Sequence, residues 1–341
     1  MSTSPQSWSS GAQRVPDQRV GTPGEPVLAG LGTSSAAGDA RSGGGGAAER
    51  HPHRTAPDRL PTRPSLLELV FDHIHSEWAM EIIRGVEQVL SAEQAALVLS
   101  ELGGDHRPRD DWFDDLLDRR PLGVVLVVVE LGDGQRRRLT AAGIPFVFVD
   151  PAEEQPPGVP VVGSANRVGG EAATRHLVEL GHRRIAVISG PMRLPCSRAR
   201  VEGFRGALAA GGLSAAPDHV RYGEFRATSG YRHGLELLGR PDRPTAVFAG
   251  SDYQALGVMR AAHELGLSVP DDLSVVGYDD LSINEWSGPP LTTVRQPLRD
   301  MGAVAARMAI TLARGQRPPH ERIDLATELV VRQSTAPPRH P

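Results

Sequence analysis

The chain has 341 residues, of which 39% are hydrophobic and 23% charged. This size and balance fit roughly two or three folding units, or one bilobed unit, with a sizeable core. The formal net charge of −4 excludes an overall basic, nucleic-acid-binding surface. A single cysteine, Cys196, excludes a disulfide framework and a cysteine-based zinc cluster. No apolar run is long enough to cross a bilayer, and the first thirty residues lack the apolar stretch of a secretory signal.

Residues 1–64 differ in composition from the remainder of the chain. They contain no Ile, Phe or Tyr, they are rich in proline, and four glycines follow one another at 43–46. Such a segment buries too little apolar surface to offset the entropy lost on ordering. We therefore expect residues 1–64 to be disordered.

From Leu66 onward, short apolar runs alternate with amphipathic stretches. The apolar runs predict strands at 66–71, 95–99, 124–129, 146–149, 185–189, 246–249 and 273–278. The amphipathic stretches predict helices at 78–90, 110–119, 135–142, 168–180, 198–210, 227–238, 251–265 and 298–313. Several runs are almost wholly apolar, as parallel strands covered on both faces are. The alternation predicts an α/β fold with doubly wound sheets.

The number of strand–helix units is too large for one sheet. About four units precede Pro151 and about four follow Val161, which predicts two doubly wound parallel-sheet lobes with a cleft between them. Ligands of such sheets bind beyond the carboxyl ends of the strands. The positions to inspect are therefore Asp72, Asp150, residues 190–200, Ser251, Asp252, Asp279 and Asp280.

Seven segments of the chain resemble the LacI/GalR family of bacterial transcription regulators. They are EIIRGVE at 81–87, ELGHRRIAVISGP at 179–191, SRARVEGF at 197–204, TAVFAGSD at 245–252, LGVMRA at 256–261, DDLSVVGYDD at 271–280 and PPLTTVRQP at 289–297. They occur in the order and at the spacing of the family, and the resemblance extends over residues 66–335.

The resemblance implies a periplasmic-binding-protein-like pair of α/β lobes, usually homodimeric, between which the chain crosses three times. Carried over to this sequence, the effector-binding domain covers 65–335. Its first lobe would comprise 66–162 with 293–323, and its second lobe 163–292 with 324–335.

The resemblance also implies three charged effector contacts. Arg200 matches an arginine that binds effector hydroxyls, and a helix-start ion pair is the alternative. Asp279 matches a carboxylate that accepts hydroxyl hydrogen bonds, whereas Asp280 beside it could cap a helix. Asp150 resembles a further hydroxyl acceptor, and turn formation before Pro151 is the alternative.

Five further side chains complete the candidate effector site. Trp78 and Phe225 match positions where aromatic rings pack on a sugar or purine, with core packing as the alternative. Gln296 matches a polar contact near the hinge, or it is a plain surface residue. Ser251 stands where the family commonly has Asn, and Asp72 opens the atypical stretch DHIH at 72–75.

The same stretch raises the question of a metal site. Asp72, His73 and His75 carry groups that bind metals, but their spacing fits no metal motif. We expect neither a metal nor another cofactor. For Cys196, a small buried hydrophobic role near the cleft is the expectation.

The helix-turn-helix that opens regulators of this family is not recognisable in residues 1–64, where glycines and prolines would break a recognition helix. All 37 basic residues are arginine, which indicates a GC-rich gene with long open alternative frames. Our hypothesis is that residues 1–64 are a frame-displaced or wrongly started translation of the DNA-binding segment. We therefore expect no specific operator binding by the chain as written.

Four functions remain to be compared. The first is a cytoplasmic, ligand-responsive regulator that binds a sugar-like effector, or a nucleoside or purine, together with operator DNA and a second copy of itself. The alternative is a stand-alone small-molecule sensor without DNA binding. A periplasmic transport receptor would need a signal peptide, and an enzyme would need a nucleophile–base pair or metal set that the sequence does not offer. The sequence favours the regulator, of the repressor type, and we expect no enzymatic activity and no membrane partner.

Overall fold

The computed structural model describes residues 65–74, 76–104 and 106–339. The predicted disordered segment 1–64 lies outside the described residues, and so does His75. Within the described part of the chain, no helix is long and apolar enough to cross a membrane. The described residues all belong to one contact unit of the chain.

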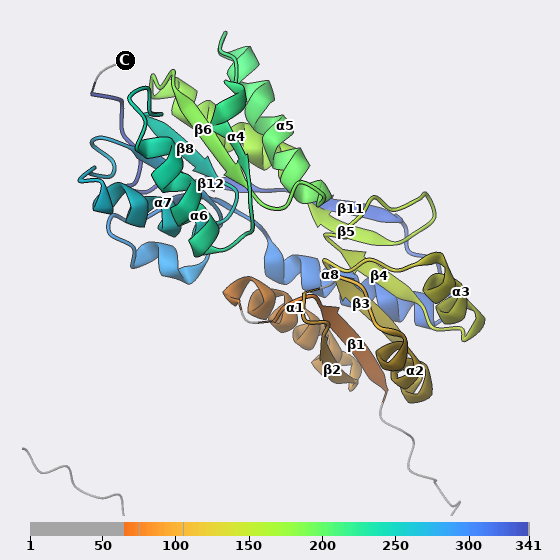
Figure 1. The fold of residues 1–341 in the computed structure, drawn as a ribbon. Helices are drawn as coiled ribbons and strands as arrows, with labels where there is room; N and C mark the ends of the chain where they lie inside the picture. Colours follow the sequence, from red (N-terminus) through yellow and green to blue (C-terminus); the bar gives the residue numbers. More distant parts are fainter. Residues whose placement is uncertain (1–64, 75, 105, 340–341) are drawn as a thin grey trace, which may run out of the picture. The chain divides into compact units, whose positions relative to one another are not determined.

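The first sheet has six parallel strands in the order β11-β5-β4-β3-β1-β2 (Figure 1). Its strands are β1 (Leu66–Phe71), β2 (Ala96–Glu101), β3 (Gly123–Val127), β4 (Phe146–Val149), β5 (Val161–Ser164) and β11 (Arg322–Leu325). The accompanying helices are α1 (Glu77–Glu93), α2 (Asp110–Arg119), α3 (Asp133–Ala141) and α8 (Leu298–Ala313). Val125 joins the core under α1 and α8, and Val124 joins the core under α2 and α3. This alternation is the two-residue period of a strand buried on both faces.

The second sheet has the order β12-β10-β9-β8-β6-β7, and β12 alone runs antiparallel to its neighbour. Its strands are β6 (Ile185–Ser189), β7 (Val220–Tyr222), β8 (Ala246–Ala249), β9 (Ser274–Asp279), β10 (Thr292–Arg295) and β12 (Glu328–Val330). The helices are α4 (Asn166–Glu179), α5 (Pro195–Ala210), α6 (Ala227–Leu238) and α7 (Asp252–Glu264), with short 3-10 turns at Pro217–His219 and Ser282–Glu285. α4 and α5 cover one face, and α6 and α7 cover the other.

Reciprocal glycines let paired helices approach closely. In the α4–α5 pair, a Cβ on Gly170 would collide with the backbone of Arg200, and a Cβ on Gly203 would collide with that of Arg167. The α1–α8 and α6–α7 pairs repeat this arrangement with Gly85, Gly302, Gly230 and Gly257. Because Gly170 packs on Arg200, this close approach also sets the place of a predicted site residue.

The predicted fold class is confirmed for the described residues, which form two doubly wound lobes. The predictions omitted β5, β7, β10, β11 and β12, because these strands have only three or four residues and several of their residues are polar. The strand predicted at 124–129 ends at Val127, because Val128 has a left-handed φ of 55°.

The chain passes between the two sheets three times, after β5, after β10 and after β11. The sheet pairing corrects the expected lobe boundaries at each passage. Residues 163–164 and 324–325 pair within the first sheet, and 293–295 pair within the second. Each passage begins where the backbone pairing of a strand ends. The pattern of apolar residues does not show where that pairing ends, so it could not place the boundaries.

Candidate functional site

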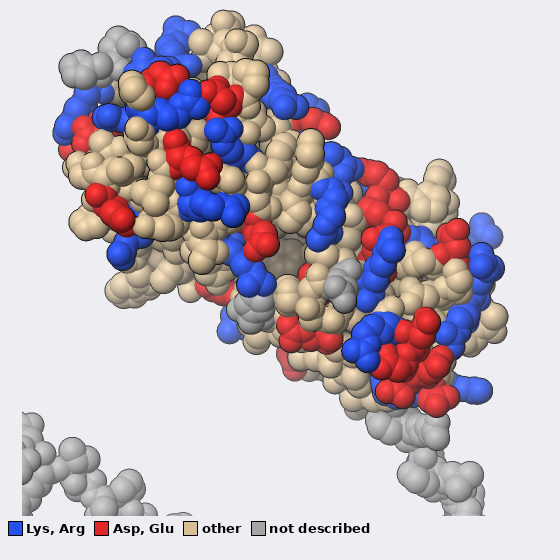
Figure 2. Space-filling view, viewed as in Figure 1, with Lys and Arg blue, Asp and Glu red and all other residues tan. Residues whose placement is uncertain are grey.

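A cavity of about 140 Å³ lies between the lobes, at the carboxyl ends of the strands. We call it the central cavity. The first lobe lines it with Ser76, Trp78, Val128 and Asp150, and the second with Leu194, Cys196, Arg200, Phe225, Ser251, Tyr253 and Asp279. Figure 2 shows the surface hollowed between the lobes, with arginine and acidic side chains on the rim. The site therefore lies where doubly wound sheets bind ligands.

The cleft continues on both sides of the central cavity. A β1-side cavity of about 290 Å³ shares Ser76, Trp78, Val128, Leu194 and Phe225 with it. A β5-side cavity of about 330 Å³ shares Asp150 and Cys196 with it. A molecule bound in the central cavity can thus extend in either direction.

Arg200 is the buried cation of the central cavity, with an exposure of 3%. Its Nε donates to Asn166 Oδ1 at 2.8 Å, and a terminal N–H donates to the carbonyl of Gly250. Its Cζ lies 3.7 Å from the ring centroid of Tyr278 and 5.2 Å from that of Phe225. Among the described residues no carboxylate forms an ion pair with Arg200 within 4.0 Å, so the helix-start ion pair is not formed.

Two buried carboxyls face this cation. Burial raises the pKa of Asp150 to about 6, although the positive charge of Arg200 opposes the shift. Burial, with a smaller effect of the Asp150 charge, raises the pKa of Asp279 to about 7, while Arg200 and the amide of Gln296 oppose it. Carboxyls held in this state near a cation can accept hydrogen bonds from hydroxyl groups.

Local backbone geometry sets the directions of three carboxyls near the cleft. Asp150, Asp279 and Asp280 have positive φ values of 42°, 115° and 60°, which are rare for residues with a side chain. Each follows or ends a strand, so a sharp turn directs the side chain out of the sheet. Such strain persists only where surrounding contacts hold it.

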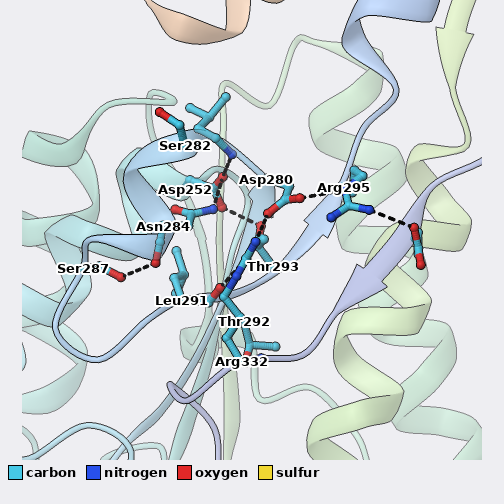
Figure 3. Close-up of polar contacts among 12 residues, drawn as sticks. Asp252, Asp280, Ser282, Asn284, Ser287, Leu291, Thr292, Thr293, Arg295 and Arg332 are labelled. Carbon is cyan, nitrogen blue, oxygen red and sulfur yellow. Dashed lines mark hydrogen bonds and ion pairs between the residues drawn. The ribbon is translucent and has the colours of Figure 1, made fainter.

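The contacts that hold the turn after β9 are shown in Figure 3. Asp280 accepts from Arg295 Nε and from Arg332 at 2.7 Å each. Burial, with a smaller effect of Asp279, raises the pKa of Asp252 well above its usual value. Asp252 accepts from the backbone N–H of Leu281 at 2.8 Å and from the side chains of Asn284 and Thr293 at 2.7 and 2.5 Å. Asp252 and Asp280 therefore support the turn, and Asp279 is the carboxyl that lines the cavity.

Asp72 and Gln296 lie beside the central cavity and do not line it. Asp72 lines the β1-side cavity, where it accepts from the backbone N–H of His106 at 2.9 Å. Gln296 lies behind Asp279: its Nε2 donates to Asp279 Oδ1 at 2.6 Å, and its Oε1 accepts from Ser164 at 2.6 Å. Gln296 is 4% exposed, so the alternative of a plain surface residue is wrong.

The structure thus brings six of the eight predicted residues to one cavity: Trp78, Asp150, Arg200, Phe225, Ser251 and Asp279. Ser251 also caps α7, where its side chain accepts from the N–H of Gln254. Sequence reasoning missed Tyr253 and Asn166. Tyr253 directly follows the Ser251–Asp252 pair, so its position was a signal that could have found it.

No group of three or more metal-binding side chains is placed to hold an ion in the part of the chain that the structure describes. Cys196 lines the central cavity, but burial raises the pKa of its thiol to about 11. A thiol with so high a pKa is a weak nucleophile near neutral pH.

Comparison with known proteins identifies the family. A model described as a periplasmic binding protein-like domain matches residues 174–335. The transcriptional regulator CelR of Thermobifida fusca is 34% identical over 295 residues, which cover 83% of this chain and 85% of that protein. The chain belongs to the LacI family of transcriptional regulators.

Other LacI-family proteins extend the comparison. The ribose operon repressor of Escherichia coli K12 is 33% identical over 231 residues, which cover 67% of this chain and 70% of the repressor. A CelR–cellobiose complex has a TM-score of 0.73 at 34% identity, with 81% of this chain and 86% of the other covered. A LacI-family regulator from Enterococcus faecium with bound ribose has a TM-score of 0.72 at 26% identity, with 80% of this chain and 99% of the other covered. The lac repressor dimer bound to operator and the anti-inducer ONPF has a TM-score of 0.70 at 27% identity, with 84% of this chain and 100% of the other covered.

Proposed function

We propose that this LacI-family protein is a ligand-responsive transcriptional regulator whose effector is a sugar or sugar-like molecule bound between the lobes. The observation that carries the proposal is the central cavity, which combines one buried arginine, two buried carboxyls and aromatic walls. Neutral molecules with many hydroxyl groups need donors and acceptors of this kind, together with flat apolar surfaces.

Each side chain has a role in this proposal. Arg200 donates to effector hydroxyl oxygens, and Asp150 and Asp279 accept from hydroxyl groups. Trp78 and Phe225 pack against the faces of the ring. Ser251 offers a further hydroxyl, Asp72 contacts an effector that reaches into the β1-side cavity, and Gln296 acts through Asp279.

We propose further that the effector has two rings. The central and β1-side cavities share five lining residues, so one molecule can occupy both. The similarity to CelR, which was solved with cellobiose, supports this size. The similarity to a regulator solved with ribose makes a single ring the alternative outcome.

The effector would act by changing the angle between the lobes and hence the DNA affinity of a homodimer. Couplings between two such sites are typically about 1–3 kcal/mol. Operator DNA and a second copy of the chain are the proposed macromolecular partners, as in the lac repressor dimer bound to operator. We propose no enzymatic activity, no metal or other cofactor, and a cytoplasmic location beside the chromosome.

The effector proposal is tested by thermal unfolding of the full chain with cellobiose, ribose or guanosine. A ligand at 100 times its Kd adds about 2.7 kcal/mol of stability. We expect cellobiose to raise Tm by several degrees and Arg200→Lys to remove that rise. A rise in Tm with guanosine alone would mean that the effector is a nucleoside and not a sugar. No rise with any of the three, or a rise that persists in Arg200→Lys, would contradict the proposed site.

The position of the ligand is tested with Cys196, the one cysteine of the sequence, which lines the central cavity. Bound cellobiose should slow alkylation of this thiol by N-ethylmaleimide at pH 9, and Cys196→Ser gives the background. Unchanged alkylation at saturating sugar would place the ligand outside the central cavity.

The regulator is distinguished from a stand-alone sensor by DNA binding. The full chain and a variant with a LacI-family helix-turn-helix joined before Leu66 are titrated against the upstream region of the gene at physiological salt. We expect specific, dimer-dependent binding by the joined variant and only weak, salt-sensitive binding by the chain as written. Tight specific binding by the chain as written would show that residues 1–64 do recognise operator DNA, against our expectation.

A further inference from the structure

Arg200 is kept apart from two carboxyls that it could neutralise. Asp150 and Asp279 both line the central cavity with it, and their charges act on it, yet neither forms an ion pair with it among the described residues. An arginine beside buried carboxyls is normally stabilised by pairing with one of them. Something else must therefore hold the guanidinium in place.

The bond to Asn166 provides this restraint. Asn166 is the first residue of α4, 8% exposed, and its Oδ1 accepts from Arg200 Nε at 2.8 Å. Because a guanidinium can only donate, the amide oxygen must face Arg200. The amide Nδ2 then donates to the carbonyl of Ser164 at 3.2 Å. Both bonds fix the amide in one orientation.

The plane and the rotation of the guanidinium are thereby determined. The ring of Tyr278, 3.7 Å from Cζ, fixes the plane, and Asn166 with the carbonyl of Gly250 fixes the rotation within that plane. Asn166 itself lines the β5-side cavity and not the central one. It acts on the site through Arg200.

Ser164 connects this restraint to the second carboxyl. Its carbonyl accepts from Asn166, and its hydroxyl donates to Gln296, whose amide donates to Asp279. Ser164 ends β5, and Asn166 begins α4, so the first passage between the lobes lies between these two residues. The supports of Arg200 and of Asp279 therefore meet at one hinge residue.

We propose that Asn166 is a positioning residue that holds Arg200 away from Asp150 and Asp279, so that all three charged groups remain available to an effector. The predicted effect on effector binding rests on the proposed function of the central cavity. Without Asn166, Arg200 turns toward a carboxyl, forms an ion pair and occupies part of the central cavity.

The test combines a ligand-dependent and a ligand-free measurement on the full chain. Asn166→Ala should weaken cellobiose binding, measured by calorimetry, by about tenfold or more, because the effector must then break an ion pair. Asn166→Asp, which keeps an acceptor for Arg200, should retain affinity within about threefold. Affinity within about twofold of the natural chain in Asn166→Ala would overturn the proposal.

The ligand-free measurement is the pH dependence of stability. The groups that face Arg200 are Asp150, Asp279, Tyr278 and Cys196, and Asp252 faces Asp279. Folded carboxyls with raised pKa values bind protons that the unfolded chain releases, so their contribution to stability falls as pH rises from 5 to 8. In Asn166→Ala the new ion pair lowers a folded pKa, and this fall should shrink. A merely structural loss would lower stability equally at every pH.

Controls make each outcome decisive. Thr174→Val removes a buried hydroxyl from the same helix and should leave the pH slope unchanged. If neither cellobiose nor ribose binds the natural chain, the effector proposal fails, and the pH slope alone still decides about Asn166: a smaller slope supports the proposal and an unchanged slope overturns it. If Asn166→Ala does not fold, Asn166→Ser, whose side chain is too short to reach Nε, replaces it.

Discussion

The guanidinium of Arg200 lies over the ring of Tyr278, with 3.7 Å between Cζ and the ring centroid. Both side chains are buried, and they come from different elements, α5 and β9. This contact takes the place of the salt bridge that usually stabilises a buried arginine, and Arg200 at the same time lines the central cavity. The fold and the candidate site therefore depend on the same side chain.

Arg200→Lys tests this double role. Lysine keeps the charge but cannot form the planar stack or the two directed bonds to Asn166 and Gly250. We expect a loss of about 1–3 kcal/mol in the free energy of unfolding and at least a tenfold weaker affinity for the bound sugar. Urea unfolding and calorimetry give the two values. The exposed Arg205→Lys in the same helix should change neither, and equal losses in both variants would contradict the assigned role.

The sequence revealed the lobes and most of the cavity for a physical reason. Apolar strands produce a period that can be read directly, and the residues after them necessarily gather at one edge of a sheet. Asp150 and Asp279 were found because each follows or ends such a strand. The fold class and most of the candidate cavity could be predicted from these patterns together with the family resemblance.

The polar contacts behind the cavity could not be predicted in the same way. Asn166 and Gln296 are 130 residues apart in the chain and are connected through Ser164 at the hinge. Such contacts depend on three-dimensional closure and leave no local period. The short strands β5 and β10, which bring these residues together, were also missed because they carry polar residues.

The raised pKa values predict an unusual pH dependence of stability. Asp279 has an unfolded pKa of about 3.9 and a folded pKa of about 7. The folded chain therefore binds more protons between these values, and stability falls as pH rises through the window. Asp279→Asn should match the natural chain near pH 3.5, where the carboxyl is protonated in both states, and exceed it at pH 8 by on the order of 4 kcal/mol.

Guanidinium chloride unfolding at both pH values measures this difference. Asp150→Asn should show the same kind of pH-dependent gain in stability. Its pH window should end near 6, the pKa of Asp150 in the folded chain. The exposed Asp133→Asn is the matched control and should show no pH-dependent gain. A lower stability of Asp279→Asn at pH 8 would mean that the ionised carboxyl supports the fold.

Another buried carboxylate serves the fold and not the site. Glu68 in β1 is fully buried and accepts from Arg119 at 3.1 and 2.6 Å and from Ser100 at 2.8 Å. Arg119→Ala leaves this charge unpaired and should cost about 3–5 kcal/mol of the free energy of unfolding. Replacing both Glu68 and Arg119 by Met should cost much less, because no buried charge is left unpaired.

The exposed ion pair of Arg175 and Glu171 is the control for these variants of the buried pair. Arg175→Ala should cost at most about 1 kcal/mol. If Arg119→Ala proves as mild as Arg175→Ala in urea unfolding, water or another cation must reach Glu68, and the pair is not a buried support of β1.

The last prediction compares two glycines of α5 that lie one turn apart. A Cβ on Gly203 would collide with the backbone of Arg167 and Glu171 in α4, whereas a Cβ on Gly206 meets open space. Gly206→Ala should stabilise the chain by about 0.5–1 kcal/mol, because glycine loses more entropy than alanine in a helix. Gly203→Ala has the same helical gain but should cost about 1–3 kcal/mol overall, because α4 must move. Urea unfolding of both variants gives the sign directly, and since Arg167 and Asn166 lie in the same turn of α4, the movement should also weaken sugar binding in Gly203→Ala alone. Stabilisation by both substitutions would show that α4 and α5 are not held at the close distance that places Asn166 against Arg200.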